Sequence, residues 1–476
     1  MKKVKIIGRI NEQKRLQELY NSKKSEFVAI YGRRRVGKTF LVRQTFENDI
    51  LFDLTGLAKG KTRQQLKNFN VSLRKTANQR INIAGNWLEA FEQLRIFIEK
   101  SDKKRKVLFI DEIPWLDTQR SDFLTGLEHF WNSWANWTND ILLIVCGSAT
   151  SWITNKLINN HGGLHNRLTA HIYLEPFTLA ETEQYLKNKG IKYTQYQIAE
   201  CYMVMGGIPY YLNQIENGLS VAQNIDKKFF SRNSELQNEF DNLYASLFKN
   251  SEDYVKVVKA LSTKTKGLTR NEILKATKLK SGDGISNVLK NLEYCGFIRT
   301  YTSPTKRERN ILYQLLDAYT LFYFKYITNF KGNDEHFWTN SLNTPTQNSW
   351  SGYAFEILAL QHIREIKNAL GISGVATNVY AWRSENSDPA VQIDLVLDRK
   401  DGMYNICECK FSEKQYVITK TDEENFRHKI YSFREENMDN KAINFVMITT
   451  CGIKKNKYFS IVQREITLLD LFKIVV

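Results

Sequence analysis

The stretch that decides the fold is Tyr31-Gly32-Arg33-Arg34-Arg35-Val36-Gly37-Lys38-Thr39. It matches the pattern G-x-x-x-x-G-K-[ST] at every fixed position. The apolar run from Phe27 to Ile30 precedes it and predicts a buried strand, while Phe40 to Gln44 follow at helical spacing. In such an arrangement, backbone N–H groups of the loop and of a helix N-terminus converge on an anion. The sequence therefore predicts a phosphate-binding loop between a strand and a helix.

The residues of this loop have separate predicted roles. The backbone at Gly32, Val36 and Gly37 is expected to curl tightly around the phosphates of a nucleotide. Lys38 is expected to reach the β- and γ-phosphates, and the Thr39 hydroxyl to bind Mg²⁺. The expected cofactors are therefore ATP and Mg²⁺.

The second half of the predicted site is the Walker B pattern, in which four apolar residues, 107–110, are followed by Asp111 and Glu112. A strand buried on both faces would bring Asp111 to the C-terminal edge of a parallel sheet, beside the Mg²⁺ held by Thr39. Glu112 would then orient and deprotonate the attacking water. The pair predicts hydrolysis as well as binding.

Three further apolar runs, at 50–54, 141–146 and 171–174, predict the remaining strands. Ser148 follows the second of them, where a γ-phosphate sensor is expected. Arg167 precedes the third and has two interpretations: a surface ion pair, or an arginine that stabilises transition-state charge in cis or across a subunit interface. Helices are predicted over 62–100 and 121–137. Their apolar residues at helical spacing are predicted core, with an exposed partner surface as the alternative for the last three: Trp87, Leu88, Phe91, Leu94, Ile98, Trp131, Trp134 and Trp137.

The composition places broad limits on the function. A chain of 476 residues has room for about three domains, and its formal net charge of +17 favours a polyanionic partner, DNA first. No apolar run approaches the length that spans a membrane, so no membrane contact is expected. The six cysteines are scattered, which favours reduced thiols in the cytoplasm over a zinc site or disulfides.

Residues 251–317 predict a winged helix. Three helical patterns are followed by two strand patterns, 297–302 and 311–315, that would pair around a basic tip. Lys306, Arg307 and Arg309 at that tip suit contacts with DNA phosphates. The alternative is that the segment is only a structural spacer against the neighbouring helices.

The C-terminal part of the sequence predicts a second site. Strand patterns at 391–397 and 405–411 flank the turn signal Asp401-Gly402, and alternation puts Glu408 and Lys410 on one face. Together with Asp394, they match the pattern D-x(n)-E-x-K. Asp394 and Glu408, assisted by the carbonyl of Cys409, would bind Mg²⁺, and Lys410 would serve the attacking water. Glu356, on a preceding helix, is a candidate for a further metal contact.

Three motifs together resemble the archaeal-type ATPases of the AAA+/STAND group: the loop with its triple arginine, Asp111 to Leu116, and Gly206 to Leu212. The resemblance implies a five-stranded parallel core and a helical lid whose Pro209 packs against the adenine. It also implies adenine-side contacts for Ile7, Gly8 and Arg9. The terminal domain resembles the restriction-endonuclease-like PD-(D/E)xK module that is commonly fused to these ATPases. One departure is that Ile393, in place of proline, precedes Asp394.

The predicted fold class is α/β with a P-loop ASCE ATPase core. The predicted divisions are a core at 1–180, a helical lid at 181–248, a winged helix at 249–318, a connector at 319–345 and a nuclease-like α/β domain at 346–476. The resulting hypothesis is an ATPase whose nucleotide state controls a DNA-directed, Mg²⁺-dependent nuclease-like domain. The alternative is a nucleotide-switch scaffold whose terminal domain only binds nucleic acid or a protein. Monomer and homo-oligomer both remain open.

Overall fold

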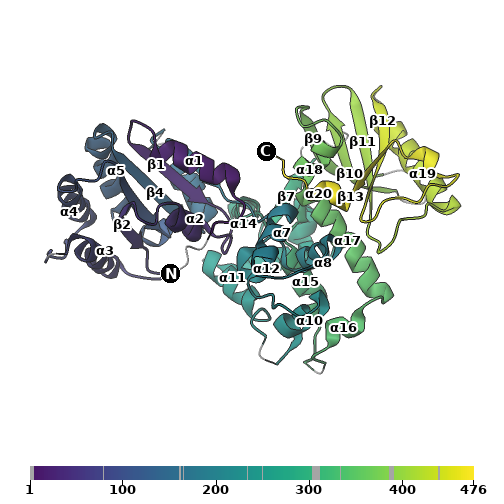
Figure 1. Ribbon diagram of the computed structural model, residues 1–476, viewed down its shortest axis with the longest axis horizontal. Coiled ribbons are helices and arrows are strands. Elements are labelled where there is room, and N and C mark those ends of the chain that lie inside the picture. Colours follow the sequence, from purple (N-terminus) through teal and green to yellow (C-terminus); the bar gives the residue numbers. More distant parts are fainter. Residues whose placement is uncertain are drawn as a thin grey trace. The chain divides into compact units, whose positions relative to one another are not determined.

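The structure is a computed structural model that describes residues 5–78, 80–159, 162–164, 166–232, 234–248, 250–302, 311–332, 334–384, 391–437 and 440–475. The chain divides into two compact units, Met1–Pro176 and Phe177–Val476. Among the described residues, the first unit contains one five-stranded sheet, and the second contains a three-stranded and a five-stranded sheet (Figure 1). The first predicted boundary, at 180, therefore lies four residues beyond the observed division at 176.

The first unit is built on a five-stranded parallel sheet in the order β2-β3-β4-β1-β5. Each of the five predicted strands is present: β1 Glu26–Tyr31, β2 Ile50–Thr55, β3 Lys106–Asp111, β4 Ile141–Gly147 and β5 Ala170–Tyr173. Strand β1 lies between β4 and β5, because Ile30 pairs with Cys146 of β4 and with Ile172 of β5. The carboxyl ends of β1, β3 and β4 therefore meet at one edge of the sheet, which is where ligands of such sheets bind.

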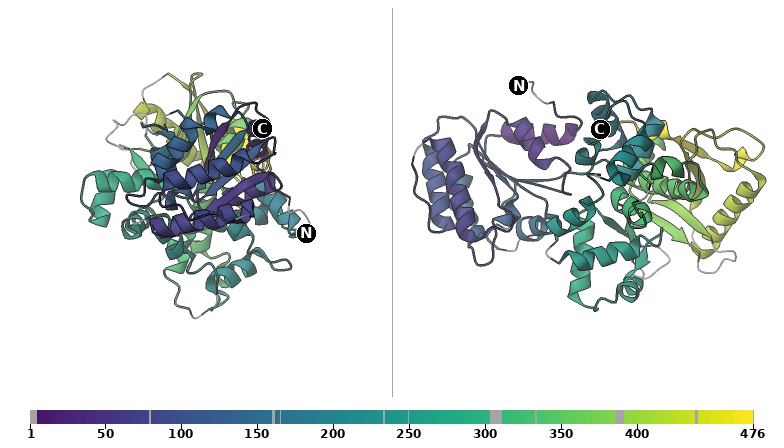
Figure 2. Two further views of the ribbon diagram at one scale, coloured as in Figure 1. Left: turned by 90° about the vertical axis from the view of Figure 1, so that its left-hand side faces the viewer. Right: turned by 90° about the horizontal axis from the view of Figure 1, so that it is seen from below.

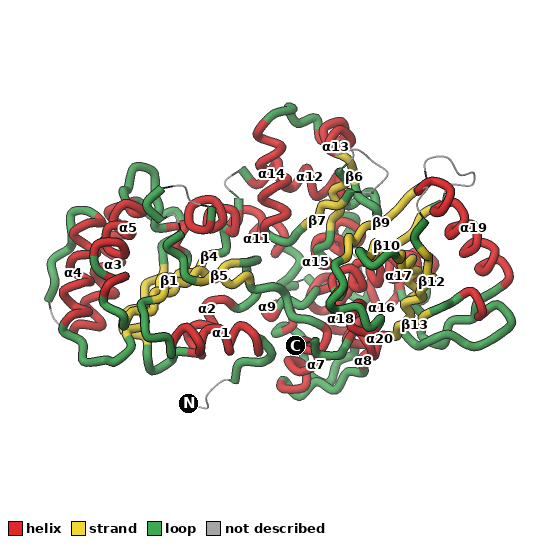
Figure 3. Tube along the Cα trace, turned by 90° about the horizontal axis from the view of Figure 1, so that it is seen from above, coloured by secondary structure: helices red, strands yellow, loops and turns green. Residues whose placement is uncertain are grey.

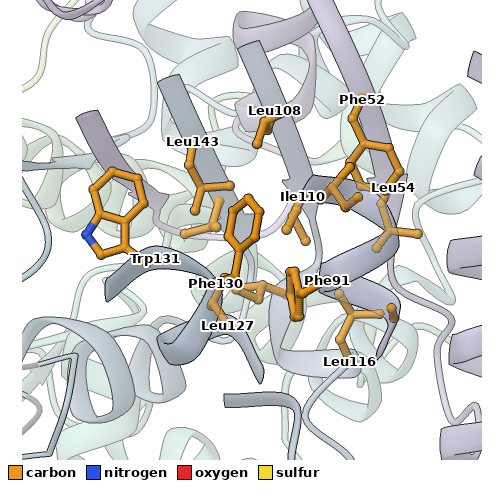
Figure 4. Packing of buried hydrophobic residues seen from close by; sticks show 14 of the residues in the cluster. Phe52, Leu54, Phe91, Leu108, Ile110, Leu116, Leu127, Phe130, Trp131 and Leu143 are labelled. Atoms are coloured by element: carbon orange, nitrogen blue, oxygen red, sulfur yellow. The ribbon is translucent and has the colours of Figure 1, made fainter. Parts of the chain in front are cut away.

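Helices cover both faces of this sheet, with α1 and α2 on one side and α3, α4 and α5 on the other (Figures 1 and 2). Their bounds are α1 Ile10–Tyr20, α2 Lys38–Thr45, α3 Thr62–Ala77, α4 Trp87–Glu99, α5 Phe123–Ser133 and α6 Thr150–Ile153. The α3–α5 side forms a large apolar core in which Phe91, Leu127 and Phe130 face Leu108, Ile110 and Leu143 of the strands (Figure 4). Fully buried Trp87 and Trp131 confirm their prediction as core.

Two of the predicted core residues are not core. Leu88 is 47% exposed and Trp137 is 72% exposed. The predicted helix over 121–137 ends at Ser133, and Trp137 follows in a separate 3-10 turn, Ala135–Trp137, so the helical spacing no longer decides where its ring points. Leu88 lies in the first turn of α4, one position beyond buried Trp87, and therefore faces away from the buried stripe.

The second unit begins with helices, whose starts are encoded locally. Thr178, Thr194 and Ser220 each form a capping box with a Glu or Gln three residues later, which satisfies backbone N–H groups at the helix start. The helices are α7 Leu179–Asn188, α8 Gln195–Met205, α9 Pro209–Leu212, α10 Val221–Ile225 and α11 Glu239–Leu247.

The segment predicted as a connector is folded. It contains α15 Ala318–Phe322 and α16 Phe337–Ser341, and four of its aromatic side chains are buried: Tyr319, Phe322, Tyr326 and Trp338. Phe322 contacts Phe229 edge to face, with ring centroids 5.2 Å apart, and Trp338 contacts Trp350 in the same way at 5.4 Å. The aromatic richness of this stretch is therefore a core signal.

The middle of the second unit has the order helix, short strand, two helices and two strands (Figure 3). Its antiparallel sheet has the order β6-β8-β7, and the tip between β7 and β8 lies outside the described residues. The bounds are α12 Ser251–Leu261, β6 Leu268–Thr269, α13 Arg270–Thr277, α14 Asp283–Tyr294, β7 Ile298–Tyr301 and β8 Leu312–Leu315.

The C-terminal part carries a mixed five-stranded sheet in the order β13-β12-β11-β10-β9. Strands β9, β10 and β11 run antiparallel to their neighbours in that set, whereas β11, β12 and β13 run parallel. The pairing of β10 with β9 is irregular between Ile393 and Val396, a bulge that includes Asp394. The bounds are α17 Pro345–Gln361, α18 Ile363–Ala369, β9 Thr377–Arg383, β10 Gln392–Arg399, β11 Met403–Lys410, α19 Lys420–Asn437, β12 Ala442–Thr449, β13 Arg464–Thr467 and α20 Leu468–Leu471.

Within the described residues, no helix combines the length and apolar character needed to cross a membrane.

Candidate functional sites

The phosphate loop follows β1 and ends at the start of α2. Gly37 has φ 94°, a left-handed conformation that favours glycine, and it directly precedes the first helical residue, Lys38. Gly32 has φ 139°, and a Cβ there would meet the carbonyl oxygen of Leu174 at 2.4 Å. Both glycines are therefore required by the backbone path.

Lys38 is buried within this loop and is fully hydrogen-bonded. Its ammonium donates to the carbonyls of Gly32 and Arg33, both at 2.9 Å, and to the Ser148 hydroxyl at 3.3 Å. Three oxygens around one ammonium show that the loop holds the lysine head at its centre. The ammonium thus lies at the sheet edge where a phosphate would bind.

Thr39 and Asp111 meet as the two motifs predict. The Thr39 hydroxyl donates to Asp111 Oδ2 at 2.7 Å, although the residues are 72 positions apart in the chain. Burial raises the pKa of the Asp111 carboxyl, the hydrogen bond from Thr39 opposes this change, and the nearby charge of Glu112 adds to it. A divalent cation beside this carboxylate would remove the cost of the buried charge.

Glu112 lies one residue beyond the end of β3 and contacts Ser148. Its two carboxylate oxygens accept hydrogen bonds from the Ser148 hydroxyl at 2.8 Å and from the Ser148 N–H at 3.1 Å. Glu112 has φ 47°, a strained conformation for a residue with a side chain, and such strain is concentrated at functional sites. The turn that follows packs so closely that a Cβ on Gly147 would meet Pro114 Cδ at 2.7 Å.

The predicted N-terminal contacts lie beside the phosphate loop. The buried guanidinium of Arg9 donates to the Val36 carbonyl at 3.3 Å, and Gln13 Nε2 donates to the Gly8 carbonyl at 2.7 Å. Ile7 is partly buried just before them. Arg9 is therefore anchored to the loop, while the contact of Ile7, Gly8 and Arg9 with adenine remains a prediction.

The roles predicted for Arg167 and Pro209 remain predictions. Arg167 is exposed in the segment before β5. Pro209 is the first residue of α9, and the preceding Gly207 is packed so tightly that a Cβ would meet the Phe177 carbonyl oxygen at 1.9 Å. The second glycine of the Gly-Gly-x-Pro segment, Gly207, is therefore required by close packing against the Phe177 backbone.

Sequence reasoning missed Arg43, which binds Asp53 through two hydrogen bonds of 3.0 Å and also donates to Thr55 at 3.2 Å. The pair joins α2 to β2, immediately behind the loop. In the sequence, the only indication of this contact was a basic residue one helical turn after Thr39.

The second candidate site forms around the hairpin of β10 and β11. Asp394 Oδ2 accepts a hydrogen bond from the Cys409 N–H at 3.3 Å, so the bulge of β10 directs this carboxylate at β11. Lys410 Nζ lies 3.0 Å from Glu408 Oε1, which confirms that the two share a face. The three residues of the D-x(n)-E-x-K pattern are therefore neighbours.

Two lysines that the sequence did not indicate complete this site. Lys266, between α12 and β6, donates to Glu356 Oε2 at 2.6 Å and to Asp394 Oδ1 at 2.9 Å. Lys429 of α19 donates to Glu408 Oε2 at 2.6 Å. No local motif marks either lysine, since each reaches the site only through the tertiary fold.

The charges in this site shift one another. Burial raises the pKa of Glu356 to about 7, and the neighbouring Asp394 carboxylate adds to the effect. Burial would also raise the pKa of Asp394, but Lys266 and Lys429 outweigh it and hold that pKa below its usual value. Asp394 is therefore the carboxylate that stays ionised.

The donor chemistry of this site suits Mg²⁺, because carboxylate and carbonyl oxygens are its preferred ligands. The arrangement does not: Asp394, Glu408 and Glu356 are each paired with a lysine, and across the described ranges no three His, Cys, Asp or Glu side chains are grouped to hold a metal. The metal-binding role of these three residues stays a prediction.

Lys306, Arg307 and Arg309, the predicted DNA contacts, lie outside the described residues.

The first site lies in a region that is similar to a known protein family. Residues 7–215 match the family described as an ATPase domain predominantly from Archaea. This range contains the phosphate loop, Asp111, Glu112 and the Gly206–Leu212 segment. The chain is also 26% identical to an uncharacterised protein of Methanocaldococcus jannaschii over 365 residues, which cover 76% of this chain and 78% of that protein.

Solved structures with similar folds include a Walker-type ATPase of Pyrococcus abyssi, with a TM-score of 0.49 and 17% identity, which covers 67% of this chain and 96% of its own. The ORC2 protein of Aeropyrum pernix, solved as ADPNP–ADP complexes, has a TM-score of 0.41 and 12% identity and covers 75% of this chain and 96% of its own.

Proposed function

We propose that this chain, whose residues 7–215 form an archaeal-type ATPase domain, binds and hydrolyses ATP. The observation that carries the proposal is the hydrogen bond of 2.7 Å between Thr39 and Asp111, with Glu112 as the next residue. Two acidic groups at the end of β3 and a lysine–threonine pair at the start of α2 are the parts that phosphoryl transfer to water requires.

Each residue has a distinct role in this proposal. The backbone of Gly32, Val36 and Gly37 and the ammonium of Lys38 bind the phosphates, while Thr39 and Asp111 hold the Mg²⁺ that accompanies ATP. Glu112 orients the attacking water and takes its proton, and Ser148 contacts the γ-phosphate. On the family resemblance, Arg167 stabilises transition-state charge, and Ile7, Gly8, Arg9 and Pro209 contact the adenine.

The test is release of inorganic phosphate from ATP by the purified chain, with and without Mg²⁺. We expect Mg²⁺-dependent turnover that Asp111→Asn removes. Turnover in Asp111→Asn at the wild-type rate would exclude this site as the catalytic one.

A second candidate function is a DNA-directed nuclease-like activity of the C-terminal domain, controlled by the nucleotide state. The observation in its favour is the proximity of Asp394, Glu408 and Lys410 on adjacent strands, with Glu356 beside them. The order of α12 to β8 supports a winged helix, and a winged helix together with a net charge of +17 favours DNA as the partner. The alternative is a scaffold whose terminal domain binds nucleic acid or protein without cleaving.

The decisive assay measures cleavage of duplex, branched and single-stranded DNA with Mg²⁺ or Mn²⁺, in the presence and absence of ATP. Cleavage that Lys410→Ala removes would establish the nuclease. If the wild-type chain cuts none of these substrates, the nuclease proposal is abandoned and the ATPase proposal is unaffected.

A further inference from the structure

We propose that Lys266 is a built-in counterion that takes the place of a divalent cation between Glu356 and Asp394, so that a metal binds there only when Lys266 withdraws. The inference concerns regulation of the second candidate site and rests on the proposed role of its carboxylates.

The Lys266 ammonium contacts two carboxylates at once, as a bound cation would. One ammonium lies 2.6 Å from Glu356 Oε2 and 2.9 Å from Asp394 Oδ1, and the side chains are mostly buried, with exposed fractions of 15% for Lys266, 21% for Glu356 and 12% for Asp394. Charge-assisted hydrogen bonds of this length use the same oxygen lone pairs that a metal would need. The lysine ammonium therefore competes with a metal for these two atoms, through its charge as well as through the lone pairs.

The backbone that carries Lys266 is fixed at several points. Gln314 Nε2 donates to the Thr265 carbonyl at 2.7 Å, the Tyr353 hydroxyl donates to the same carbonyl at 3.3 Å, and the Tyr301 hydroxyl donates to the Lys266 carbonyl. The next residue, Gly267, has φ 84°, and a Cβ there would meet the Tyr313 carbonyl oxygen at 2.4 Å. The lysine is thus presented by a defined turn, unlike a flexible surface side chain.

The charges of the site balance only when Lys266 is counted. Lys266 pairs with both Glu356 and Asp394, whereas Lys410 and Lys429 both pair with Glu408, which gives three lysines to three carboxylates. Lys410 and Lys429 belong to the C-terminal sheet and its helix, whereas Lys266 comes from the α12–β6 segment. Without Lys266, two neighbouring buried carboxylates lack a partner, and this is the situation that attracts a divalent cation.

The origin of Lys266 gives the site a means of control. The α12–β8 segment is the proposed winged helix, so a ligand that binds this segment better when the turn is displaced would also expose the carboxylates. By reciprocity, a metal in the site would favour the displaced state of the segment and raise its affinity for that ligand.

The experiment measures Mn²⁺ binding to the full chain without nucleotide, by electron paramagnetic resonance of free Mn²⁺ and by melting temperature. The variant is Lys266→Met, and Lys264→Met is the matched control, because Lys264 is half-exposed two residues earlier and pairs with Glu272 at the surface. The double variant Lys266→Met/Asp394→Asn measures the background, because any Mn²⁺ that it still binds is held elsewhere, for example at Thr39 and Asp111. Lys266→Gln keeps a measurement possible if Lys266→Met does not fold, since it removes the positive charge while its side-chain amide can still donate a hydrogen bond to a carboxylate.

We expect Lys266→Met to bind Mn²⁺ at least about tenfold more tightly than wild type, because a positive charge in contact with the ligands has been removed. Its melting temperature should fall without metal and recover with Mn²⁺, while Lys264→Met should match wild type. If a folded Lys266 variant gains no Mn²⁺ affinity that depends on Asp394, Lys266 is a structural ion pair and the proposal is wrong.

Cleavage assays separate this inference from the nuclease proposal. Metal binding by Lys266→Met without any DNA cleavage would uphold the counterion and remove the nuclease. Wild-type cleavage at the same rate and metal affinity as Lys266→Met would uphold the nuclease and remove the counterion.

Discussion

Lys38 is the residue on which nucleotide binding depends most directly. Its ammonium is buried among the Gly32 and Arg33 carbonyls and the Ser148 hydroxyl. Lys38→Ala removes the ammonium that would pair with the phosphates of ATP. We expect ATP affinity to fall roughly 100-fold or more, as when a buried charge pair loses one partner. Fluorescent-nucleotide titration measures the loss, with exposed Lys67→Ala as the control. Unchanged affinity would place ATP elsewhere.

Glu112 should affect turnover and spare binding. Its carboxylate accepts hydrogen bonds from the Ser148 hydroxyl and N–H, and Glu112→Gln keeps its shape but cannot take a proton. Loss of a general base typically lowers kcat by about 10²- to 10⁴-fold, so steady-state phosphate release should drop by that factor while the ATP dissociation constant stays near the wild-type value. Normal turnover in Glu112→Gln would remove this residue from the mechanism.

At the scale of single residues, local motifs predicted the ATPase site well and the second site only in part. Lys38, Thr39 and Asp111 could be assigned because a strand–loop–helix unit fixes their positions through short-range geometry. Lys266 and Lys429 reach Asp394 and Glu408 over 128 and 21 positions in the chain, and no pattern near either lysine encodes that approach. The exposure of Leu88 and Trp137 likewise depends on where a helix begins and ends.

Among the helices, the junction of α17 and α18 depends on a buried histidine. His362 Nε2 accepts a hydrogen bond from the Leu179 N–H at 3.0 Å, at the start of α7, and Nδ1 donates to the Leu358 carbonyl at 2.8 Å. Burial lowers the pKa of His362 to about 4 from 6.5, and the Leu358 carbonyl only partly opposes this. The native state therefore requires neutral imidazole.

The sign of the pH effect follows. A folded pKa below the unfolded one means that the unfolded chain binds the extra proton, so this contribution to stability is complete above pH 6.5 and is lost as the pH falls toward 4. The total loss is roughly 3 kcal/mol. Urea unfolding at several pH values should show a shallower pH dependence for His362→Gln, which still accepts the Leu179 hydrogen bond. Parallel curves for the two proteins would contradict this.

The tip of the β7–β8 hairpin provides a prediction about DNA. If Lys306, Arg307 and Arg309 bind phosphates, replacing all three with alanine should reduce the slope of log affinity against log salt by about two to three, since each lost contact lowers it by about 0.9. Duplex binding at several KCl concentrations measures this, with Lys275, Lys278 and Lys280 of the same segment as a matched alanine control. An unchanged slope would make the segment a spacer.

Secondary structure was the most predictable level. Strands β1, β3 and β4 of the first sheet are almost entirely buried, largely apolar runs, so their pattern is clear, whereas the outer strands β2 and β5 are partly exposed. Residues 319–345 were the main difference, because asparagine and threonine between the aromatic residues suggested a connector. The α15 and α16 rings form a core only together with Phe229 and Phe230 of an earlier segment, which no local window contains.

For the molecule as a whole, the two compact units allow a test of nucleotide control. ATP with Mg²⁺ at about 100 times its dissociation constant adds about 2.7 kcal/mol to the unit that binds it. For a unit of this size, that shift raises the melting temperature by roughly 5–10 °C. Control of the second unit by nucleotide predicts that its calorimetric transition also moves, and that Lys38→Ala abolishes both shifts.

If the second transition does not move with ATP, the two units act independently. The ATPase proposal would stand, and the nucleotide control of the C-terminal domain would be abandoned. Glu112→Gln makes the comparison cleaner, because it should hold ATP without consuming it during the scan.

The strand order of the first sheet also has a consequence for how the protein is made. Val28 of β1 pairs with Ile144 on one side and with Ala170 on the other, so both neighbours of the strand that leads into the phosphate loop are translated long after it. Contacts across such separations form slowly, and apolar segments that await their partners attract chaperones. We therefore expect the phosphate loop to be synthesised well before both of its neighbouring strands, and the nucleotide site to form only after β4 and β5 have left the ribosome.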